Sequence, residues 1–406
     1  MKPCIGLVVP AIEQVGGVPA VARFVKDRVL NSGRYDLRLI SLPMSAQDES
    51  SVGISRPSSW VRGATTRRGQ WQGLPFVHVG AVIGEIEFQR YRPRRILAEA
   101  IADCAILQVV CGSPAWAFAV CGLGKPVSVQ CATRVKVERR QRDANPVGLT
   151  NWWRKAMTEI VDRMEDRALR LADAIQVENP WMYEYAHQLN EGREVDLRYA
   201  PPGIDAHTFC PATERNFEQD PYVLCAGRLD DPRKNIGLLL EAYALVPEAV
   251  RSRLRLVLAG QAGPPENFWQ RAAALGLRDR IEFIHRPSPE DLVAVFQKAG
   301  MFTLSSHEEG LGVVLLEAMA CGIPVVSTRS GGPDGIITDG VDGYLVPLDD
   351  AAALADRITR LRLDEALNRT MGQRARATIE QRYAEEVAGQ AFLDVWDRLL
   401  RKAGRA

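Results

Sequence analysis

Two glutamates eight residues apart stand where their carboxylates could bind a polar ligand. Glu309 follows the apolar stretch 301–304, which predicts a strand, and Glu317 lies in the apolar run that comes next. Gly310 and Gly312 let the backbone approach a ligand closely, and amides at the start of a helix attract anions and hydroxyl groups. Surface helices often carry glutamates by chance, but the run VVLL between these two favours a site.

Two cations follow an earlier predicted strand, YVLCA at residues 222–226. Arg228 comes just after this strand and its following glycine, and Lys234 stands near the start of the predicted helix 236–245. Two fixed cations and a helix N-terminus together suit a pyrophosphate group. Solvated side chains at an ordinary helix start are the alternative interpretation.

Glycine pairs follow two further strands. Gly16 and Gly17 separate the predicted strand 4–9 from the predicted helix 18–30, where they form either a cradle for phosphate or sugar or a plain turn. A second pair opens the sequence GGPD at 331–334, which predicts a turn that closes part of the binding cleft.

The elements that must position these residues alternate between short apolar strands and helices. Near-continuous apolar strands alternating with helices indicate parallel sheets covered on both faces, here in two doubly wound, Rossmann-like α/β domains. In such a pair, a ligand binds at the carboxyl ends of the strands, in the cleft between the domains. Residues 45–75 show little periodicity and predict a long loop. The predicted strands are 4–9, 37–42, 106–110, 126–131 and 174–177, then 222–226, 254–259, 280–284, 301–304, 323–327 and 344–347.

The stretch 196–221 interrupts this alternation with four prolines and few helix-forming residues, and it predicts the linker between the domains. We therefore expect an N-terminal domain over 1–200 and a C-terminal domain over 201–385. Residues 386–406 predict a helix, which we expect to cross back to the N-terminal domain.

Composition excludes several classes of protein. Hydrophobic residues make up 46% and charged residues 25% of the 406 residues, which excludes collagen-like, disordered and small disulfide-rich chains. The net charge of +1 argues against a nucleic-acid partner. Residues 1–200 carry six more basic than acidic residues, including clusters at 90–95 and 134–142. These clusters are either solvated, partly paired faces or a contact with an anionic membrane surface or a phosphorylated acceptor.

Cysteine spacing and one uncharged run bear on the location of the chain. The eight cysteines include no Cys-x-x-Cys pair, which favours buried free thiols in a reducing cytosol over zinc sites or disulfides. Residues 104–124 are uncharged over 21 residues, but the glutamine, glycines and proline inside favour a strand, a turn and a helix over a membrane span. No signal peptide is visible, so we expect a cytoplasmic protein, with peripheral contact at the inner membrane face as an option.

The second half of the chain resembles the retaining, nucleotide-sugar-dependent glycosyltransferases of family 4, which have the GT-B fold. The Glu-x7-Glu signature runs from Glu309 to Glu317. In residues 1–200 only the opening strand, glycine pair and helix are family-like. The matching stretches are PPGIDAHTFCP (201–211), AGRLDDPRKNIGLLLEAY (226–243), RLVLAGQ (255–261) and SSHEEGLGVVLLEAMACGIPVVSTRSGGPDGIITDGVDGYLV (305–346).

The resemblance implies a role for each matching residue. Arg228 and Lys234 would hold the donor diphosphate and offset charge on the leaving group. Glu309 would bind the donor sugar and complete the set of catalytic residues, and Glu317 would bind the ribose. The remaining donor-binding residues would be Gly16 and Gly17 at the diphosphate, Arg286 and Pro287 in the segment 285–287 at the base, and Gly310, Leu311 and Gly312 at the sugar.

The resemblance also implies the reaction. A hexose would pass with retention from a nucleoside-diphosphate donor, a UDP-sugar first and GDP-mannose next, to a hydroxyl of a saccharide, a lipid-linked glycan or a small natural product. Because cations and helix dipoles replace a metal, neither a metal nor a cofactor is expected. A covalent role for Glu309 is less favoured, because the family places it beside the sugar hydroxyls.

Departures from the family pattern keep alternatives open. Family members commonly carry a histidine after an N-terminal strand, whereas the matching stretch PVSVQCATR (126–134) has Gln130 and Ala132 and no histidine. His78 is either its substitute or a hydrogen-bonded core histidine. Gly335 stands where the family often has glutamate. A partner-dependent or catalytically degenerate GT-B subunit is therefore the alternative function, and an epimerase or phosphorylase is a second.

Aromatic residues in two predicted helices of the N-terminal domain have two interpretations. They either line an acceptor groove or pack into the core, and packing is favoured. The helices span 151–172 and 180–190, and the residues are Trp152, Trp153, Trp181 and Met182.

Overall fold

The computed structural model describes residues 2–14, 16–143, 149–213 and 221–404. The chain folds as two compact units, the first formed by residues 1–202 with 388–406 and the second by residues 203–387. The division falls inside the stretch 196–221 that predicts a linker, although residues 196–199 form a strand and residues 214–220 lie outside the described residues.

The first unit is built on an eight-stranded sheet with the order β3-β4-β2-β1-β5-β6-β7-β8. All neighbouring strands run parallel except β3 and β4, which form an antiparallel hairpin. The central strands β1 and β5 are apolar and buried, as expected for a sheet covered on both faces. The strands are β1 (Cys4–Pro10), β2 (Asp36–Leu42), β3 (Thr66–Trp71), β4 (Leu74–Val79), β5 (Ile106–Cys111), β6 (Val127–Cys131), β7 (Ala174–Val177) and β8 (Asp196–Tyr199).

The prediction of a long loop over 45–75 is wrong in its middle, where Pro57–Arg62 forms helix α2, and at its C-terminal end. Thr66–Trp71 forms strand β3, and Gln72 and Gly73 join it to β4 with φ values of 49° and 76°. A two-residue turn with positive φ at both positions is the usual hairpin connection. The sequence TRRGQW shows no apolar alternation because β3 is a mostly exposed edge strand, so periodicity could not reveal it.

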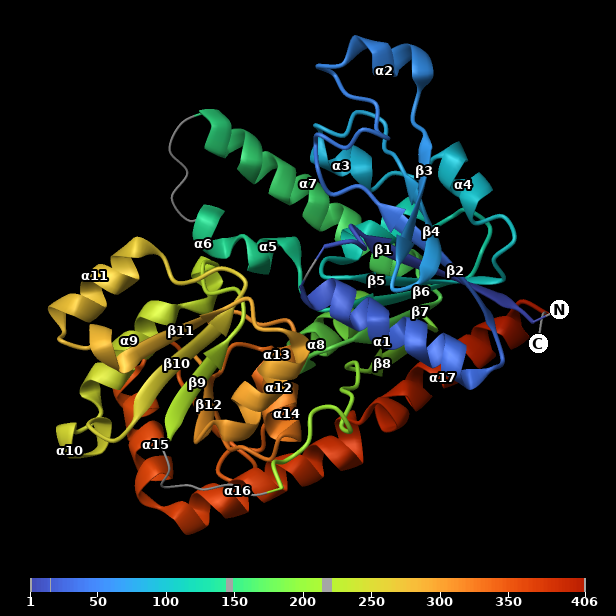
Figure 1. The fold of residues 1–406 in the computed structure, drawn as a ribbon. Helices are drawn as coiled ribbons and strands as arrows, with labels where there is room; N and C mark the ends of the chain where they lie inside the picture. Colours follow the sequence, from blue (N-terminus) through green and yellow to red (C-terminus); the bar gives the residue numbers. More distant parts are fainter. Residues whose placement is uncertain (1, 15, 144–148, 214–220, 405–406) are drawn as a thin grey trace. The chain divides into compact units, whose positions relative to one another are not determined.

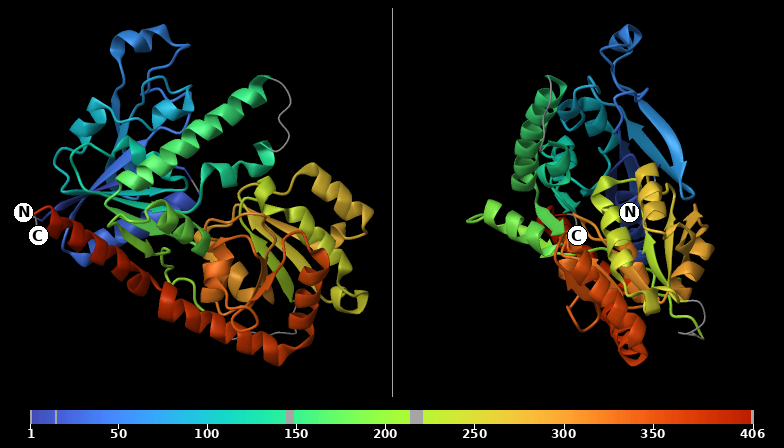
Figure 2. Two further views of the ribbon diagram at one scale, coloured as in Figure 1. Left: turned by 180° about the vertical axis from the view of Figure 1, so that it is seen from behind. Right: turned by 90° about the vertical axis from the view of Figure 1, so that its left-hand side faces the viewer.

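Helices cover both faces of this sheet. Helix α1 and the C-terminal helix α17 pack with β1 and β5 on one face, and Figure 1 shows these two helices running side by side. Helices α7 and α8 pack on the other face, and the view from behind in Figure 2 shows α7 crossing it. The helices are α1 (Gly17–Ser32), α2 (Pro57–Arg62), α3 (Glu87–Arg90), α4 (Arg95–Ala100), the 3₁₀ helix η1 (Pro114–Ala119), α5 (Val135–Glu138), α6 (Arg140–Asp143), α7 (Leu149–Leu171), α8 (Pro180–Leu189) and α17 (Glu385–Lys402).

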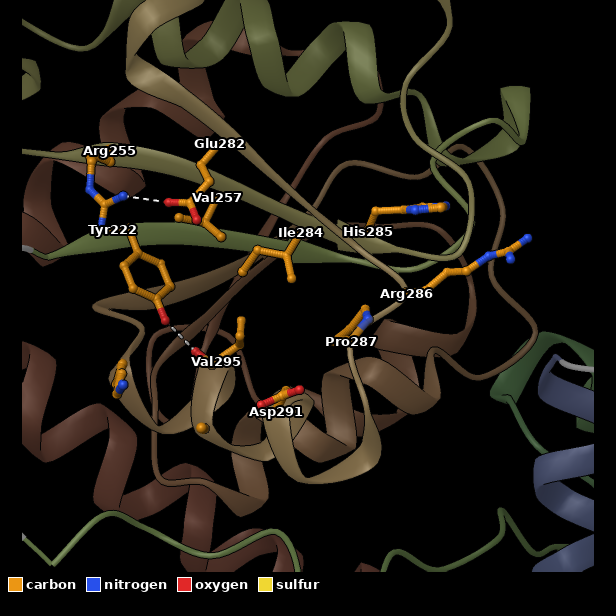
Figure 3. A pocket seen from close by; sticks show the side chains of 12 residues that line it. Tyr222, Arg255, Val257, Glu282, Ile284, His285, Arg286, Pro287, Asp291 and Val295 are labelled. Carbon is orange, nitrogen blue, oxygen red and sulfur yellow. Dashed lines mark hydrogen bonds and ion pairs between the residues drawn. The ribbon is translucent and has the colours of Figure 1, made fainter.

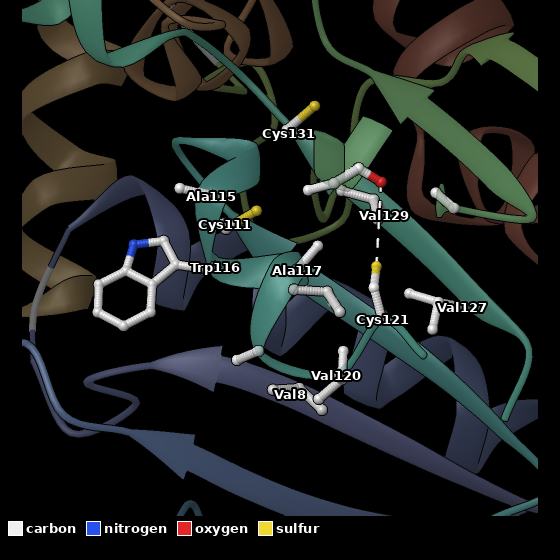
Figure 4. Packing of buried hydrophobic residues seen from close by; sticks show 14 of the residues in the cluster. Val8, Cys111, Ala115, Trp116, Ala117, Val120, Cys121, Val127, Val129 and Cys131 are labelled. Carbon is white, nitrogen blue, oxygen red and sulfur yellow. Dashed lines mark hydrogen bonds between the residues drawn. The ribbon is translucent and has the colours of Figure 1, made fainter. Parts of the chain in front are cut away.

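The uncharged run 104–124 lies in the core. It forms β5, a turn and η1, in line with the predicted strand, turn and helix. Figure 4 shows Ala117 of η1 on the side of Val129 of β6, and Val120, which follows η1, beside Val8 of β1. Trp116 is 7% exposed and packs edge to face on Tyr91, with 4.6 Å between the ring centroids. The absence of charge therefore reflects burial inside the unit.

His78 is a hydrogen-bonded core histidine. It lies on β4 and is 6% exposed, with Nδ1 3.1 Å from Ser41 Oγ and Nε2 2.9 Å from Asp48 Oδ1. Burial alone would raise the pKa of Asp48, but hydrogen bonds from His78 and Ser51 lower it below its usual value. His78 holds the loop after β2 and is not a substitute for the family histidine.

The basic clusters of the first unit are partly paired and partly solvated. The exposed members are Arg92, Arg95, Lys136 and Arg140. Arg134 is 8% exposed and lies 2.7 Å from Asp162 and 2.6 Å from Asp166. Arg90 and Arg94 donate to main-chain carbonyls, and burial lowers the pKa of Arg94 to about 10. The buried and half-buried members therefore tie elements of the first unit together, while the exposed members are solvated, as the first of the two interpretations expects. The side chains of residues 141 and 142 lie outside the described part.

The favoured packing of the aromatic residues holds for one pair only. Met182 is fully buried, and Trp181 packs against the same core. Trp152 and Trp153, at the start of α7, are 68% and 57% exposed, so the prediction of packing is wrong for them.

The second unit is built on a six-stranded, fully parallel sheet with the order β11-β10-β9-β12-β13-β14. Both units are thus doubly wound α/β folds, as predicted. The strands are β9 (Tyr222–Ala226), β10 (Arg255–Gly260), β11 (Ile281–His285), β12 (Met301–Leu304), β13 (Val325–Thr328) and β14 (Tyr344–Val346).

Helices pack on both faces of the second sheet, in two apolar clusters. The predicted turn at 331–334 is wrong, because residues 332–336 form a short helix after the strand. The helices are η2 (Pro232–Lys234), α9 (Ile236–Leu245), α10 (Glu248–Arg251), α11 (Glu266–Ala274), η3 (Arg278–Arg280), α12 (Pro289–Lys298), α13 (Val313–Ala320), α14 (Gly332–Ile336), α15 (Ala351–Leu363), α16 (Glu365–Thr378) and the π-helical turn η4 (Ile379–Tyr383).

Helix α17 gives a test of how the first unit is stabilised. Trp396 is fully buried, packs on Tyr35 and Phe392, and donates from Nε1 to Gln108 at 2.8 Å. We expect Trp396→Ala to lower the free energy of unfolding by about 3–5 kcal/mol, because it removes a large buried side chain and leaves a cavity. Val387→Ala, at a 45% exposed position of the same helix, should change it by less than about 0.5 kcal/mol. Urea unfolding measures both, and equal effects would contradict this account of the packing.

Candidate functional site

Arg228 lies just beyond the carboxyl end of β9, which is an inner strand of the second sheet. Gly227 links it to the strand and donates its N–H to the carbonyl of Ala259 at 2.9 Å. A Cβ atom on Gly260 would lie 2.2 Å from the carbonyl oxygen of Gly227, so the ends of β9 and β10 touch closely there. The guanidinium group of Arg228 is 3.2 Å from Asp231 Oδ2 and largely exposed. The predicted cation therefore stands at the edge where a doubly wound sheet binds its ligand.

Lys234 and Glu309 form an ion pair. The Nζ atom of Lys234 is 2.6 Å from Glu309 Oε1, and the two side chains are 15% and 8% exposed. Ser306 Oγ donates to the same carboxylate oxygen at 2.5 Å. Two residues that the sequence assigns to one site thus lie together, in the loops after β9 and β12.

Main-chain hydrogen bonds hold the loop 305–312 on both sides. Towards β9, His307 N–H donates to the carbonyl of Arg233 at 2.8 Å. Towards β13, Glu309 donates to the carbonyl of Ser330 at 2.8 Å and accepts from Gly332 at 3.0 Å. A Cβ atom on Gly332 would lie 2.4 Å from the carbonyl of Leu311, so this contact requires glycine. The carboxylate of Glu309 is therefore fixed in place by its own backbone.

Three further charged residues surround this pair, and the sequence analysis missed them. Arg233 lies 2.8 Å from Asp231 and 3.1 Å from Glu308. Burial would raise the pKa of Asp231, but hydrogen bonds from Arg233 and the charges of Arg233 and Arg228 lower it. Asp231 also caps η2, accepting from the N–H of Arg233 at 3.0 Å. The Asp-Pro pair at 231–232, typical of a helix start, was the available signal.

Glu317 and the glycines lie where the sequence places them. Gly312 caps α13 with a φ of 89°, a left-handed conformation that favours glycine. Leu311 is buried beside it. Glu317 is the fifth residue of α13, among buried apolar neighbours, while Glu309 and Gly310 stay in the loop before the helix. A ligand at the start of α13 would thus meet helix amides and two carboxylates of different depth.

Arg286 and Pro287 line one end of a pocket of about 490 Å³ between β11 and α12. Arg286 has a φ of 52°, a strained conformation for a residue other than glycine, and its N–H donates to the carbonyl of Gly260 at 2.8 Å. Figure 3 shows its side chain pointing away from Tyr222 and Glu282 at the opposite end. The pocket therefore begins at the predicted base-binding segment and continues beneath the edge strand.

Gly16 and Gly17 lie in the first unit, between β1 and α1. Gly16 has a φ of 154° and accepts at its carbonyl from the N–H of Ala20 at 3.2 Å. A Cβ atom at either position would meet nothing within 4 Å. The space around the pair is open, and its role towards a diphosphate stays a prediction.

The described residues hold no group of three or more His, Cys, Asp and Glu side chains placed to bind a metal ion. None of the helices in the described ranges is long and apolar enough to cross a membrane. All eight cysteines are free thiols, and six of them are buried.

Comparison with known proteins gives the family of this domain. Residues 210–378 match the model of the glycosyl transferases group 1 family. The chain is 30% identical over 246 residues to a D-inositol 3-phosphate glycosyltransferase of Saccharomonospora viridis, covering 57% of each protein. It is 32% identical over 170 residues to the N-acetyl-alpha-D-glucosaminyl L-malate synthase of Bacillus anthracis, covering 41% of this chain and 43% of that protein. The chain thus spans about half the length of the curated relatives it matches.

Solved structures extend the likeness of fold to the whole chain. A sucrose-phosphate synthase of Thermosynechococcus elongatus matches with a TM-score of 0.74 and 20% identity, over 99% of this chain and 100% of that one. The Anabaena protein HepE, solved with UDP-glucose, matches with a TM-score of 0.68 and 16% identity, over 97% and 99%. Together with the two doubly wound units, these neighbours confirm the predicted GT-B fold class. Residues 210–378 form a domain of the glycosyl transferases group 1 family, and the Lys234–Glu309 pair lies within it.

Proposed function

We propose that the protein is a retaining, metal-independent glycosyltransferase that moves a hexose from a nucleoside-diphosphate donor to an acceptor hydroxyl. The observation that carries the proposal is the Lys234–Glu309 ion pair beside Arg228, at the carboxyl ends of β9 and β12 in a group 1 domain. Two groups of ion pairs lie in these loops. One is Lys234 with Glu309, and the other is the series Arg228, Asp231, Arg233 and Glu308. Such an arrangement suits a ligand that is anionic at one end and hydroxylated at the other.

The cations would stabilise the leaving group. As the bond from sugar to phosphate breaks, negative charge grows on the diphosphate, and Arg228 and Lys234 offset it without a metal ion. Lys234 is little exposed, so its charge is weakly screened and acts strongly on a phosphate beside it. Arg228 is exposed and free to turn towards the ligand. The N-terminus of α9 supports the same charge.

The carboxylates would hold the hydroxylated parts of the donor. Glu309 and the amides of 310–312 would bind the sugar, and Glu317 would bind the ribose. Arg286 and Pro287 would contact the base, at the mouth of their pocket. The acceptor hydroxyl would then attack from the face that the diphosphate leaves, and the leaving phosphate would take its proton. The protein contributes orientation and charge stabilisation.

The donor is proposed to be a UDP-sugar, with GDP-mannose next. The acceptor is proposed to be a saccharide, a lipid-linked glycan or a small molecule, bound by the first unit. Two relatives are named for small anionic acceptors, an inositol phosphate and malate, which favours the small-molecule class. No membrane surface is assigned to the basic clusters, because most of their cations lie in ion pairs or on main-chain carbonyls.

In the proposed site, Glu309 competes with the diphosphate for Lys234. Removing the negative charge of Glu309 should therefore raise the affinity for a nucleoside diphosphate. We expect Glu309→Gln to bind UDP about threefold to tenfold more tightly than the wild type, because Lys234 loses its counter-ion. Transfer should nevertheless fall by about a hundredfold or more, because the sugar loses its carboxylate. Glu308→Gln removes the same charge one residue away, beside Arg233, and is the matched control. Isothermal titration with UDP measures both, and equal or weaker binding by Glu309→Gln would contradict this role.

Lys234 gives the direct test of donor binding. A nucleoside diphosphate at a hundred times its Kd should stabilise the folded protein by about 2.7 kcal/mol, seen as a rise in melting temperature that needs no magnesium. Lys234→Ala should abolish most of this rise. Arg271→Ala, at an exposed cation of α11 that pairs with Glu241, should keep it. A panel of UDP, GDP, ADP, dTDP and CDP identifies the base, and no shift with any of them would favour a non-catalytic subunit.

A further inference from the structure

A row of polar side chains crosses the buried sheet of the first unit. Its members come from three neighbouring strands and the residue after β7, and each is 4% exposed or less. They share the face on which α17 packs, where apolar residues are the rule. The row consists of Gln108, Ser128, Gln130, Gln176 and Glu178.

Hydrogen bonds join the row in pairs. Trp396 donates from Nε1 to Gln108 Oε1 at 2.8 Å, which closes the end beneath α17. Ser128 donates to Gln176 Oε1 at 2.9 Å. Gln130 donates from Nε2 to Glu178 Oε1 at 2.7 Å. Buried polar groups are costly unless they are paired, so each contact matters for the unit.

Glu178 is the one ionisable member of the row. Within the described residues it forms no ion pair, and burial and the Gln130 amide are the two influences on its pKa. Burial dominates and raises the pKa of Glu178 to about 7. The other titratable groups that act electrostatically in this region are the thiols of Cys111 and Cys131, the carboxyl of Glu165 and the guanidinium group of Arg134. Arg134 is the cation among them, and it pairs with Glu165 and Asp166.

The Gln130 amide is only half used by this contact. Its Oε1 atom is buried and has no hydrogen-bond partner in the described part of the chain. A carboxylate cannot donate a hydrogen bond to that oxygen, because an ionised carboxyl group has only acceptor atoms. A protonated carboxyl both donates and accepts, and therefore matches a primary amide with two parallel hydrogen bonds. The geometry of the pair thus favours the neutral acid.

This pair lies at the ligand edge of the sheet. Glu178 directly follows β7, and its neighbour Asn179 donates from Nδ2 to the carbonyl of Ala132 at 2.6 Å. The main-chain N–H groups of Ala132 and Thr133 donate to the carbonyl of Gly112 at 3.1 and 3.0 Å. The ends of β5, β6 and β7 are therefore tied together, at the stretch where the family resemblance expects a histidine.

We propose that Glu178 and Gln130 form a neutral carboxylic acid–amide pair that positions the acceptor-side strand ends of the first unit for glycosyl transfer. Glu178 is a positioning residue, since it acts on the acceptor through the ends of β6 and β7. When Glu178 ionises, it loses the hydrogen bond that the acid donates to Gln130 Oε1. Two buried oxygen acceptors then face each other without a proton between them, and this loosens the strand ends. The positioning role rests on the proposed function, whereas the acid–amide pair itself does not.

Stability tests the pair without any activity. A carboxyl whose pKa rises from 4.5 in the unfolded chain to about 7 in the folded one stabilises the fold fully below the lower value and loses this effect as pH approaches 7. Glu178→Gln replaces it by an amide that pairs with Gln130 at every pH. The melting temperature of the wild type should therefore fall between about pH 5 and pH 7, relative to that of Glu178→Gln. Above about pH 7 the difference between the two melting temperatures should stay constant. A difference that does not change with pH would overturn the pair.

Controls separate Glu178 from its surroundings. Glu165 is also buried with a pKa raised to about 7, by burial against hydrogen bonds from Ser113 and Val135. Ser128→Ala removes a neighbouring contact of the row without a charge. The melting curve of each control should keep the wild-type pH dependence attributed to Glu178. The two control variants are thus Glu165→Gln, which removes another buried acid, and Ser128→Ala. If Glu165→Gln fails to fold, Ser128→Ala still provides the comparison.

Transfer tests the positioning role. With saturating donor, wild-type kcat/KM for the acceptor should fall as pH rises above about 7, and Glu178→Gln should keep its activity through that range. Ser128→Ala should keep both basal activity and the fall. If Glu178→Gln falls like the wild type while the stability difference appears, the pair exists and the positioning role is wrong. If no variant transfers sugar, the proposed function fails and the stability experiment still decides the pair.

Discussion

Burial of the strands on both faces is the constraint on which this molecule depends. A parallel sheet between two layers of helices leaves its polar chemistry to the strand ends, where loops reach water. Arg228, Lys234 and Glu309 follow this constraint, because each lies just beyond a strand whose residues are buried. Glu178 also follows a strand, but its side chain remains within the buried layer. The positions that can perform chemistry are therefore few, and the sheet determines them.

In the proposed function, the ion pair between Lys234 and Glu309 is the centre of the donor-binding site. Without a ligand, the carboxylate satisfies a little-exposed ammonium group that would otherwise be costly. In the proposed function, a diphosphate offers the same ammonium a stronger anion, and the carboxylate of Glu309 can then accept from the hydroxyl groups of a sugar without moving. Ser306 and the backbone of the loop keep the carboxylate in place during this exchange. One contact thus prepares both ends of the donor site.

The sequence was enough to predict both doubly wound units and every named strand except β3, β4 and β8, because the others follow from apolar runs. Strands β4 and β8 were missed because proline, histidine or charged residues interrupt their apolar pattern. The same runs placed Lys234 and Glu309, which follow them, in one site. The sequence failed for β3, an exposed edge strand without apolar alternation, and for Trp152 and Trp153, whose exposure depends on where α7 ends its contact with the core. Arg233 and Glu308 were missed because a surface charge gains a partner only through tertiary contact. The Gln130–Glu178 pair was hidden for the same reason.

Two glutamates at strand ends show how environment decides the role of one residue type. Glu309 accepts from a lysine and a serine at the rim of its sheet, in the place where the proposed function puts a hydroxylated ligand. Glu178 receives a single amide and no cation, so burial favours the neutral form, which can complete a second hydrogen bond. The stretch 126–134 has no histidine, and in the proposed pair the donor and the acceptor of the acid are both used by the Gln130 amide. Glu178 therefore acts from within the sheet, by ordering the ends of β6 and β7, and does not offer hydrogen bonds to a ligand.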